Sequence, residues 1–205
     1  MGWYDRNILP HIIKLGCGCQ QMAEYRQKIV PLARGRVLEL GMGAGANLAF
    51  YDASRVSEVV GVEPSAELRA MAAKAALAVP LTVLVEDGVG EALPFEEASF
   101  DSVVCTFTLC SVGDPLRTLA EARRVIRPGG ALLFHEHGAS PEAGVARWQR
   151  RIEPVWKRLF GGCHLTRPVS GSIAQHFRIE TVERFYQPGM PRFAAYMESG
   201  RATAA

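Results

Sequence analysis

Residues 36–51 read RVLELGMGAGANLAFY: an apolar run, a glycine-rich turn and the beginning of a helical pattern. Gly41, Gly43 and Gly45 permit a tight turn and let backbone N–H groups face a ligand. A turn of this kind after a buried strand is typical of α/β proteins that bind nucleotides. The glycines alone fit both a dinucleotide such as NAD and S-adenosylmethionine, so the choice between them depends on the rest of the chain.

Apolar runs bounded by turn signals alternate with helical patterns along the chain. The runs are continuous and rich in β-branched residues, as expected of strands covered on both faces. Ser65 and Asp114 are expected to cap two of the helices. The predicted strands are 36–41, 58–63, 81–87, 100–108 and 130–137, and the predicted helices are about 45–52, 65–77 and 114–126. This alternation predicts an α/β fold with a doubly wound, Rossmann-like, mostly parallel sheet.

The chain of 205 residues is expected to form a single domain. The expected parts are an N-terminal helical cap at 1–34, a cofactor-binding core at 35–137, a helical insertion on the acceptor side at 138–176, and antiparallel C-terminal strands at 177–205 that form an edge of the sheet. Within the insertion, Pro154 is expected to kink or interrupt a helix.

Composition and charge exclude several classes of protein. The hydrophobic fraction of 48% and the charged fraction of 21% are ordinary globular values, and a net charge of +2 is too small to indicate a nucleic-acid partner. The N-terminus has neither the layout of a signal peptide nor an apolar span of about 20 residues. The sequence therefore predicts a cytoplasmic protein without a transmembrane segment. The five cysteines, odd in number and irregularly spaced, favour reduced thiols.

Three later features favour the methyl donor over NAD. Glu39 lies inside the first predicted strand, where a dinucleotide fold usually keeps an apolar residue, and a buried carboxylate needs a partner such as an ammonium group. The stretches EALPFEEASFDSVVC (91–105) and RRVIRPGGALLF (123–134) follow in order. Together with the glycine-rich turn, these features resemble the class I methyltransferases. The resemblance covers residues 36–137 and implies S-adenosyl-L-methionine as cofactor and S-adenosyl-L-homocysteine as product.

Further strings resemble the thiol methyltransferase-like 7 family and its short bacterial relatives. They are YDRNILPHIIKL near the start, CTFTLCSVGDP (105–115), FHEHG (134–138) and PVWKRLFGGCHLTRP (154–168). The animal members are membrane-attached alkyl-thiol methyltransferases, and because their N-terminal apolar anchor has no counterpart here, membrane attachment is not carried over. The resemblance implies a small hydrophobic thiol as acceptor. The alternatives are O-, N- or C-methylation of a quinone, phenol or lipid headgroup, a non-catalytic cofactor-binding module, and an NAD-dependent oxidoreductase.

The predicted cofactor site combines the glycine-rich turn with the ends of neighbouring strands. Glu63 ends the second predicted strand, where its carboxylate is expected to bond ribose hydroxyls. The position after Gly88, often an aspartate in class I methyltransferases, is Val89, so adenine recognition is expected to rest on the backbone of Val89 and Gly90. The predicted cofactor-binding residues are Glu39, Gly41, Gly43, Gly45, Asn47, Glu63, Pro64, Gly88, Val89, Gly90 and Thr106.

Side chains after the fourth and fifth strands are the candidates for chemistry, since ligands bind at the carboxyl ends of parallel strands. His137 is predicted to act as a base or orienting group, with Glu136 either as its partner or as an indirect support, although His137 could simply bond a loop carbonyl. Alternation along the strand should point His135 and His137 to one side and Glu136 to the other. His164 is a further catalytic candidate, with capping of its own loop as the alternative. The predicted acceptor-binding residues are Tyr4, His11, Cys110 and Arg167.

No metal is expected. Cys17, Cys19 and Cys163 could gather around arsenite, but the C-x-C spacing differs from the C-x-x-C of zinc sites. The predicted partner is a small-molecule acceptor, and the sequence carries no signal of an oligomeric state. The helix within 145–160 has a basic face that could make weak contact with a membrane surface, but its apolar stripe is expected to dock on its own domain.

Overall fold

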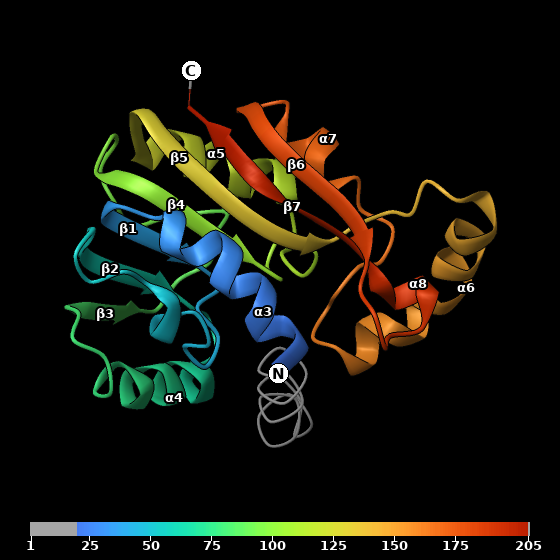
Figure 1. Ribbon diagram of the computed structural model, residues 1–205, viewed down its shortest axis with the longest axis horizontal. Coiled ribbons are helices and arrows are strands. Elements are labelled where there is room, and N and C mark those ends of the chain that lie inside the picture. The colour runs from blue at the N-terminus through green and yellow to red at the C-terminus, as the bar shows by residue number, and fades with distance from the viewer. Residues whose placement is uncertain (1–19, 205) are drawn as a thin grey trace.

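The computed structural model describes residues 20–204 and contains a seven-stranded sheet in the order β3-β2-β1-β4-β5-β7-β6 (Figure 1). The strands are β1 (Gly35–Leu40), β2 (Val56–Val62), β3 (Val83–Glu86), β4 (Phe100–Thr106), β5 (Ile126–His137), β6 (Arg178–Tyr186) and β7 (Tyr196–Thr203). The helices are α3 (Gln20–Ile29), α4 (Ala66–Ala76), α5 (Pro115–Val125), α6 (Ala143–Leu159), α7 (Val169–Ile173) and α8 (Arg192–Ala195), with 3₁₀ turns η1 (Val30–Leu32) and η2 (Leu48–Phe50).

Strands β1 to β5 are parallel, and β7 pairs antiparallel with both β5 and β6. This confirms the predicted α/β sheet with an antiparallel C-terminal edge. The chain leaves β1 for β2 and β3 on one side and returns to β4 on the other side. The order of strands therefore reverses between β1 and β4, and at such a switch point the loops diverge and leave room for a ligand. The glycine-rich turn follows β1 at this point.

Alternating side chains of the strands fill two cores, one on each face of the sheet. Leu38, Val103 and Leu132 point to the face covered by α5 and α7, and they share a cluster with Leu119 and Ile173 of those helices. The intervening strand residues share the other cluster with residues of α3 and α4. Figure 1 shows α3 crossing one face of the sheet while α5 lies behind the other. Both faces are covered, which explains the continuous apolar character of the strands.

Two predicted helices differ in the structure. The helix predicted for 45–52 is only the 3₁₀ turn η2, because the side chains of Asn47 and Tyr51 turn inward to a buried carboxylate. Helix α6 continues through Pro154 to Leu159 without interruption. On the turn after the proline, Trp156 stacks on Phe160 with their ring centroids 4.1 Å apart, and this contact supports the end of the helix.

The apolar stripe of α6 docks on the domain only in part: Val145, Ile152 and Trp156 are half-buried, whereas its other members stay exposed. Trp148, Val155 and Leu159 are 57%, 60% and 47% exposed. The inward face is instead anchored by the buried Gln149, whose amide accepts from the Ser140 N–H and donates to the Gly138 carbonyl. Trp148 also lines a surface hollow of about 700 Å³ between α6 and α8 that includes none of the predicted cofactor residues.

No helix within residues 20–204 is both long enough and apolar enough to cross a membrane.

The cap of α5 gives a test of the local folding rules. Asp114 accepts from the N–H groups of Leu116 and Arg117, each at 3.0 Å, so Asp114→Ala should lower the free energy of unfolding by roughly 1 kcal/mol. Asp114→Asn keeps the acceptor and should stay close to the wild type. Urea denaturation of the three proteins measures the difference, and equal losses in both variants would contradict the capping role.

Candidate active site

The turn after β1 is held against the loop that follows β4. Gly41 has a φ of +63°, and a Cβ built on it would lie 2.4 Å from the Thr108 hydroxyl oxygen. That hydroxyl donates to the Leu40 carbonyl at 2.9 Å. Position 41 therefore requires glycine both for its conformation and for this close approach.

Asn47 is the centre of a buried hydrogen-bond network beneath the turn. Its side-chain NH₂ donates to the Glu39 carboxylate at 2.9 Å and to the Thr106 hydroxyl at 3.0 Å. Its side-chain oxygen accepts from Arg26 Nε of α3 at 2.9 Å. The network thus joins α3, β1, the glycine-rich turn and the end of β4, and it fixes the floor of the predicted cofactor site.

Glu39 finds its partners within the protein. The Tyr51 hydroxyl donates to its second oxygen at 2.7 Å, so neither oxygen depends on a ligand ammonium for a partner. Burial raises the pKa of Glu39 to about 7, although the bonds from Tyr51 and Asn47 and the charge of Arg26 lower it. This acid thus changes its charge in the neutral range of pH.

Glu63 follows β2 and supports the other side of the turn. Its two oxygens accept from the N–H groups of Gly43 and Ser65, each at 3.0 Å, and burial raises its pKa. Pro64 is the next residue and is exposed. Beyond β3, Val89 is 44% exposed and forms an isolated bridge with Ala92, and Gly88 and Gly90 flank it. All these predicted cofactor residues lie at the carboxyl ends of β1, β2, β3 and β4.

The end of β5 points its side chains as the alternation predicts. The rings of His135 and His137 both contact Phe107, with centroids 5.0 and 5.5 Å apart. Glu136 points to the opposite side and accepts from the N–H groups of Thr108 at 2.8 Å and Cys110 at 3.2 Å. Glu136 therefore shapes the loop after β4. Direct pairing of Glu136 with His137 is excluded because the two side chains lie on opposite faces, and the indirect support of His137 remains a prediction.

His137 instead contacts sulfur. Its Nδ1 lies 3.5 Å from the Cys163 sulfur. The interaction between the neighbouring Cys110 and Cys163 thiols lowers the pKa of Cys163 and raises that of Cys110. All three residues are buried. We refer to Cys110, His137 and Cys163 as the thiol–imidazole cluster. From the sequence alone, Cys163, which lies in the LFGGCHLTR string, is considered only as an arsenite ligand with Cys17 and Cys19 and not as a neighbour of His137.

The other predicted side chains of this region hold the loop that carries Cys163. His164 Nδ1 lies 3.1 Å from one oxygen of Glu153 on α6, and the other oxygen accepts from Leu165 and Thr166 N–H groups at 2.9 Å. Arg167 donates to the Leu109 carbonyl. These contacts make His164 a tether of its own loop, the predicted alternative, and they direct Arg167 to the backbone. Tyr4, His11, Cys17 and Cys19 lie outside the described residues.

Aromatic side chains not singled out from the sequence cover the end of β5. We refer to Tyr25, Phe107 and Phe185 as the aromatic wall. Tyr25 of α3 stacks on His135 and on Phe185, with centroid distances of 5.1 and 4.6 Å. His135 is fully buried, neither of its ring nitrogens has a hydrogen-bond partner among residues 20–204, and burial lowers its pKa to about 3. Phe107 has a φ of +56°, a rare value for a residue with a side chain.

The comparison with protein families agrees with this geometry. Residues 38–134 match the family described as methyltransferase domain. The match covers 97 of the 205 residues of the chain. The matched stretch includes the glycine-rich turn, Glu63 and the strands on both sides of the switch point.

Individual relatives extend this result. Thiol S-methyltransferase TMT1B of Rattus norvegicus is 40% identical to the chain over 157 residues, which are 74% of this chain and 63% of the relative. The chain spans less than two thirds of the length of the curated thiol S-methyltransferases that it matches.

Solved structures share the fold at low sequence identity. A structure from Thermotoga maritima, described as a SAM-dependent methyltransferase and possible histamine N-methyltransferase, has a TM-score of 0.66 at 21% identity and covers 98% of this chain and 97% of its own. The [4+2]-cyclase SpnF has a TM-score of 0.71 at 19% identity and covers 90% and 80%. The described residues therefore have the fold of the class I methyltransferases, and the cyclase shows that this fold alone does not determine an activity.

Titration of Glu39 gives a test of the floor of the site. Its pKa is about 7 in the folded protein against 4.5 as its ordinary value, so between these values folding takes up a proton and stability falls as the pH rises. Glu39→Gln removes this loss. From pH 5 to pH 8 the free energy of unfolding of the variant should therefore gain roughly 2–3 kcal/mol relative to the wild type.

Urea denaturation at pH 5 and pH 8 measures this relative gain. Any difference in the free energy of unfolding that the amide of Glu39→Gln causes equally at both pH values cancels in the comparison. If the free energy of unfolding of both proteins changed in parallel with pH, the raised pKa of the buried Glu39 would be contradicted.

Proposed function

We propose that the protein transfers a methyl group from S-adenosyl-L-methionine to the sulfur of a small, hydrophobic thiol. The observation that carries this proposal is that the glycine-rich turn and the thiol–imidazole cluster both lie at the carboxyl ends of the parallel strands, with Gly41 packed against Thr108, two residues before Cys110. The glycine-rich turn is suited to an adenosyl cofactor, and the thiol–imidazole cluster is suited to an acceptor whose proton must be removed. The identity with thiol S-methyltransferases supports the same acceptor class.

The cofactor residues have separable roles in this proposal. The backbone of the turn approaches the cofactor, and Glu63, whose oxygens still have free lone pairs, accepts from the ribose hydroxyls. The backbone at Val89 and Gly90 recognises the adenine edge. The network of Glu39, Asn47 and Thr106 keeps the floor of the site rigid beneath the methionine part, so that the sulfonium methyl group is held in one position.

Methyl transfer needs alignment and a nucleophile more than it needs acid catalysis. The acceptor sulfur attacks the methyl carbon in line with the breaking carbon–sulfur bond of the sulfonium, and the products are a thioether and S-adenosyl-L-homocysteine. A free thiol has a pKa of about 8.5, so near neutral pH it needs only modest help to lose its proton. His137, at the end of β5, is the group proposed to give this help, while Tyr25 and Phe107 contribute an apolar surface.

The function is tested with purified protein, S-adenosyl-L-methionine and two panels of acceptors, short alkyl thiols and phenols. We expect formation of S-adenosyl-L-homocysteine with the thiols at a rate that exceeds the rate with phenols by at least about tenfold, as the sulfur of a thiolate is the stronger nucleophile. Mass spectrometry of the methyl thioether confirms the atom methylated. Faster turnover of the phenols, or cofactor binding without product from any thiol, would contradict the proposal.

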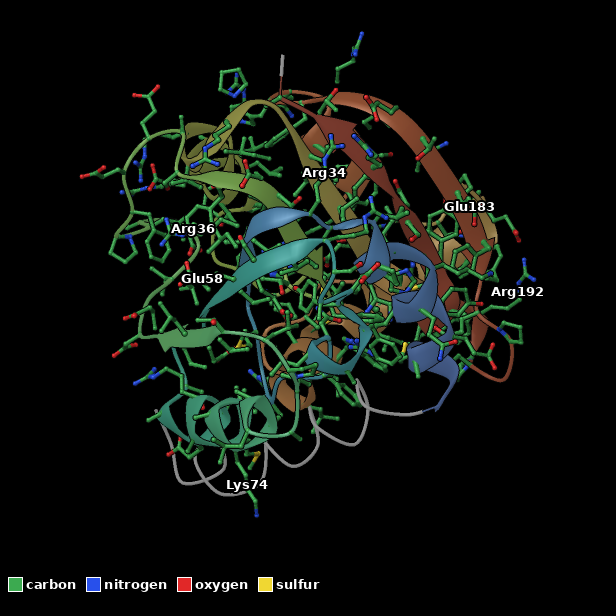
Figure 2. All side chains as sticks on the ribbon, turned by 60° about the vertical axis from the view of Figure 1, so that its left-hand side comes forward. Arg34, Arg36, Glu58, Lys74, Glu183 and Arg192 are labelled. Atoms are coloured by element: carbon green, nitrogen blue, oxygen red, sulfur yellow. The ribbon has the colours of Figure 1, made fainter. Side chains whose placement is uncertain are left out.

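The cofactor site is tested with a pair of variants on one strand and its adjoining turn. Glu63→Gln should weaken the binding of S-adenosyl-L-methionine by about tenfold or more, because a hydrogen bond to a charged group contributes roughly 1.5–3 kcal/mol. Glu58→Gln is the matched control: Glu58 lies on β2 and pairs with Arg36 of β1 at 2.7 Å (Figure 2). Titration calorimetry measures both, and equal affinities of the two variants would contradict the role of Glu63.

A further inference from the structure

The thiol–imidazole cluster has the composition and the spacing of a metal site. One ligand atom from each of Cys110, His137 and Cys163 lies within 4.8 Å of the other two. Zinc binds cysteine sulfur at about 2.3 Å and histidine nitrogen at about 2.0–2.1 Å, so two tetrahedral ligands of these kinds lie roughly 3.6 Å apart. The distance of 3.5 Å between the Cys163 sulfur and His137 Nδ1 agrees with this value.

The segments that carry the three side chains are held by hydrogen bonds of their own. Glu136 accepts from the Cys110 N–H at 3.2 Å, and the Cys110 carbonyl accepts from the His164 N–H at 2.7 Å. Glu153 accepts from the backbone two and three residues after Cys163. Support of this kind around the ligands is a regular feature of protein metal sites, because it orients them before the ion arrives.

We propose that Cys110, His137 and Cys163 bind a zinc ion through two thiolates and one imidazole. Two sulfur ligands select a thiophilic or borderline cation over magnesium or calcium, which prefer oxygen. The ion compensates the negative charge that two thiolates would otherwise carry in a buried place. Three protein ligands leave a fourth tetrahedral position, the arrangement of zinc sites that act on a substrate.

The fourth position takes the sulfur of the acceptor, and this part rests on the proposed function. The thiol binds as a thiolate and its proton passes to solvent, since a thiol on zinc is deprotonated. A lone pair of the bound sulfur then forms the new bond to the methyl carbon as the carbon–sulfur bond of the sulfonium breaks. The thioether carries no charge and is a weaker ligand, so it leaves. His137 thereby assists deprotonation as a ligand of the ion.

The site is tested first by metal content, which needs neither cofactor nor activity. The full chain is produced with zinc in the medium, dialysed and analysed by inductively coupled plasma mass spectrometry. We expect about one zinc per chain in the wild type and at least a tenfold loss in Cys110→Ser, Cys163→Ser and His137→Asn. Cys105→Ala is the control, because Cys105 is a buried thiol outside the cluster. A wild type without zinc, or the same zinc content in all variants, would overturn the proposal.

A second measurement uses the wild type alone and does not depend on the folding of variants. Cobalt replaces zinc, and we expect the thiolate-to-cobalt charge-transfer and ligand-field bands of a tetrahedral site. Addition of a short alkyl thiol should shift these bands, whereas the matching alcohol should not. Absence of the thiolate-to-cobalt bands would overturn the metal site. Bands that do not shift when the alkyl thiol is added would overturn the role of the fourth position. The methylation assay decides the proposed function separately.

Discussion

The rest of the structure depends on a carboxylate buried inside a strand, at a position where dinucleotide folds usually keep an apolar residue. Glu39 lies inside β1 with both oxygens bonded by neighbours from the following turn, and burying such a group without partners would cost several kcal/mol. Asn47 satisfies it and at the same time bonds Thr106 on β4 and Arg26 on α3. The hydrogen bonds around Glu39 therefore direct Asn47 and Tyr51 inward, so that a 3₁₀ turn forms in place of the predicted helix. Through Asn47 they also attach α3 to the sheet. The floor of the proposed cofactor site results from the need to satisfy the buried Glu39.

The acceptor side follows the same principle with two other carboxylates. Glu136 accepts hydrogen bonds from backbone N–H groups of the loop after β4, and Glu153 accepts them from backbone N–H groups of the loop after α6. Each carboxylate fixes a loop that carries a cysteine, and His137 lies between the two sulfur atoms and the aromatic wall. Loops that lack regular structure thus acquire a fixed geometry, and the proposed methyl transfer depends on such geometry because it requires alignment of donor and acceptor.

Much of the fold could be predicted, because apolar periodicity and turn chemistry are local properties. The five parallel strands, the caps at Ser65 and Asp114, and the opposed directions of His135 and Glu136 all follow from short-range rules. The exposure of Trp148 could not be predicted in this way. A helical stripe looks the same whether it docks or not, and here the polar Gln149 made the stronger contacts with the domain.

The sequence by itself determined the class of fold, the position of the glycine-rich turn and the candidates at the strand ends, since these are written in residue order and spacing. Only the tertiary structure decided which candidates meet. Cys110 and Cys163 are 53 positions apart in the chain, and their approach to His137 depends on loops held by Glu136 and Glu153. Contacts between distant segments are set by packing and by the need to satisfy buried polar groups, and neither leaves a periodic signal in the sequence.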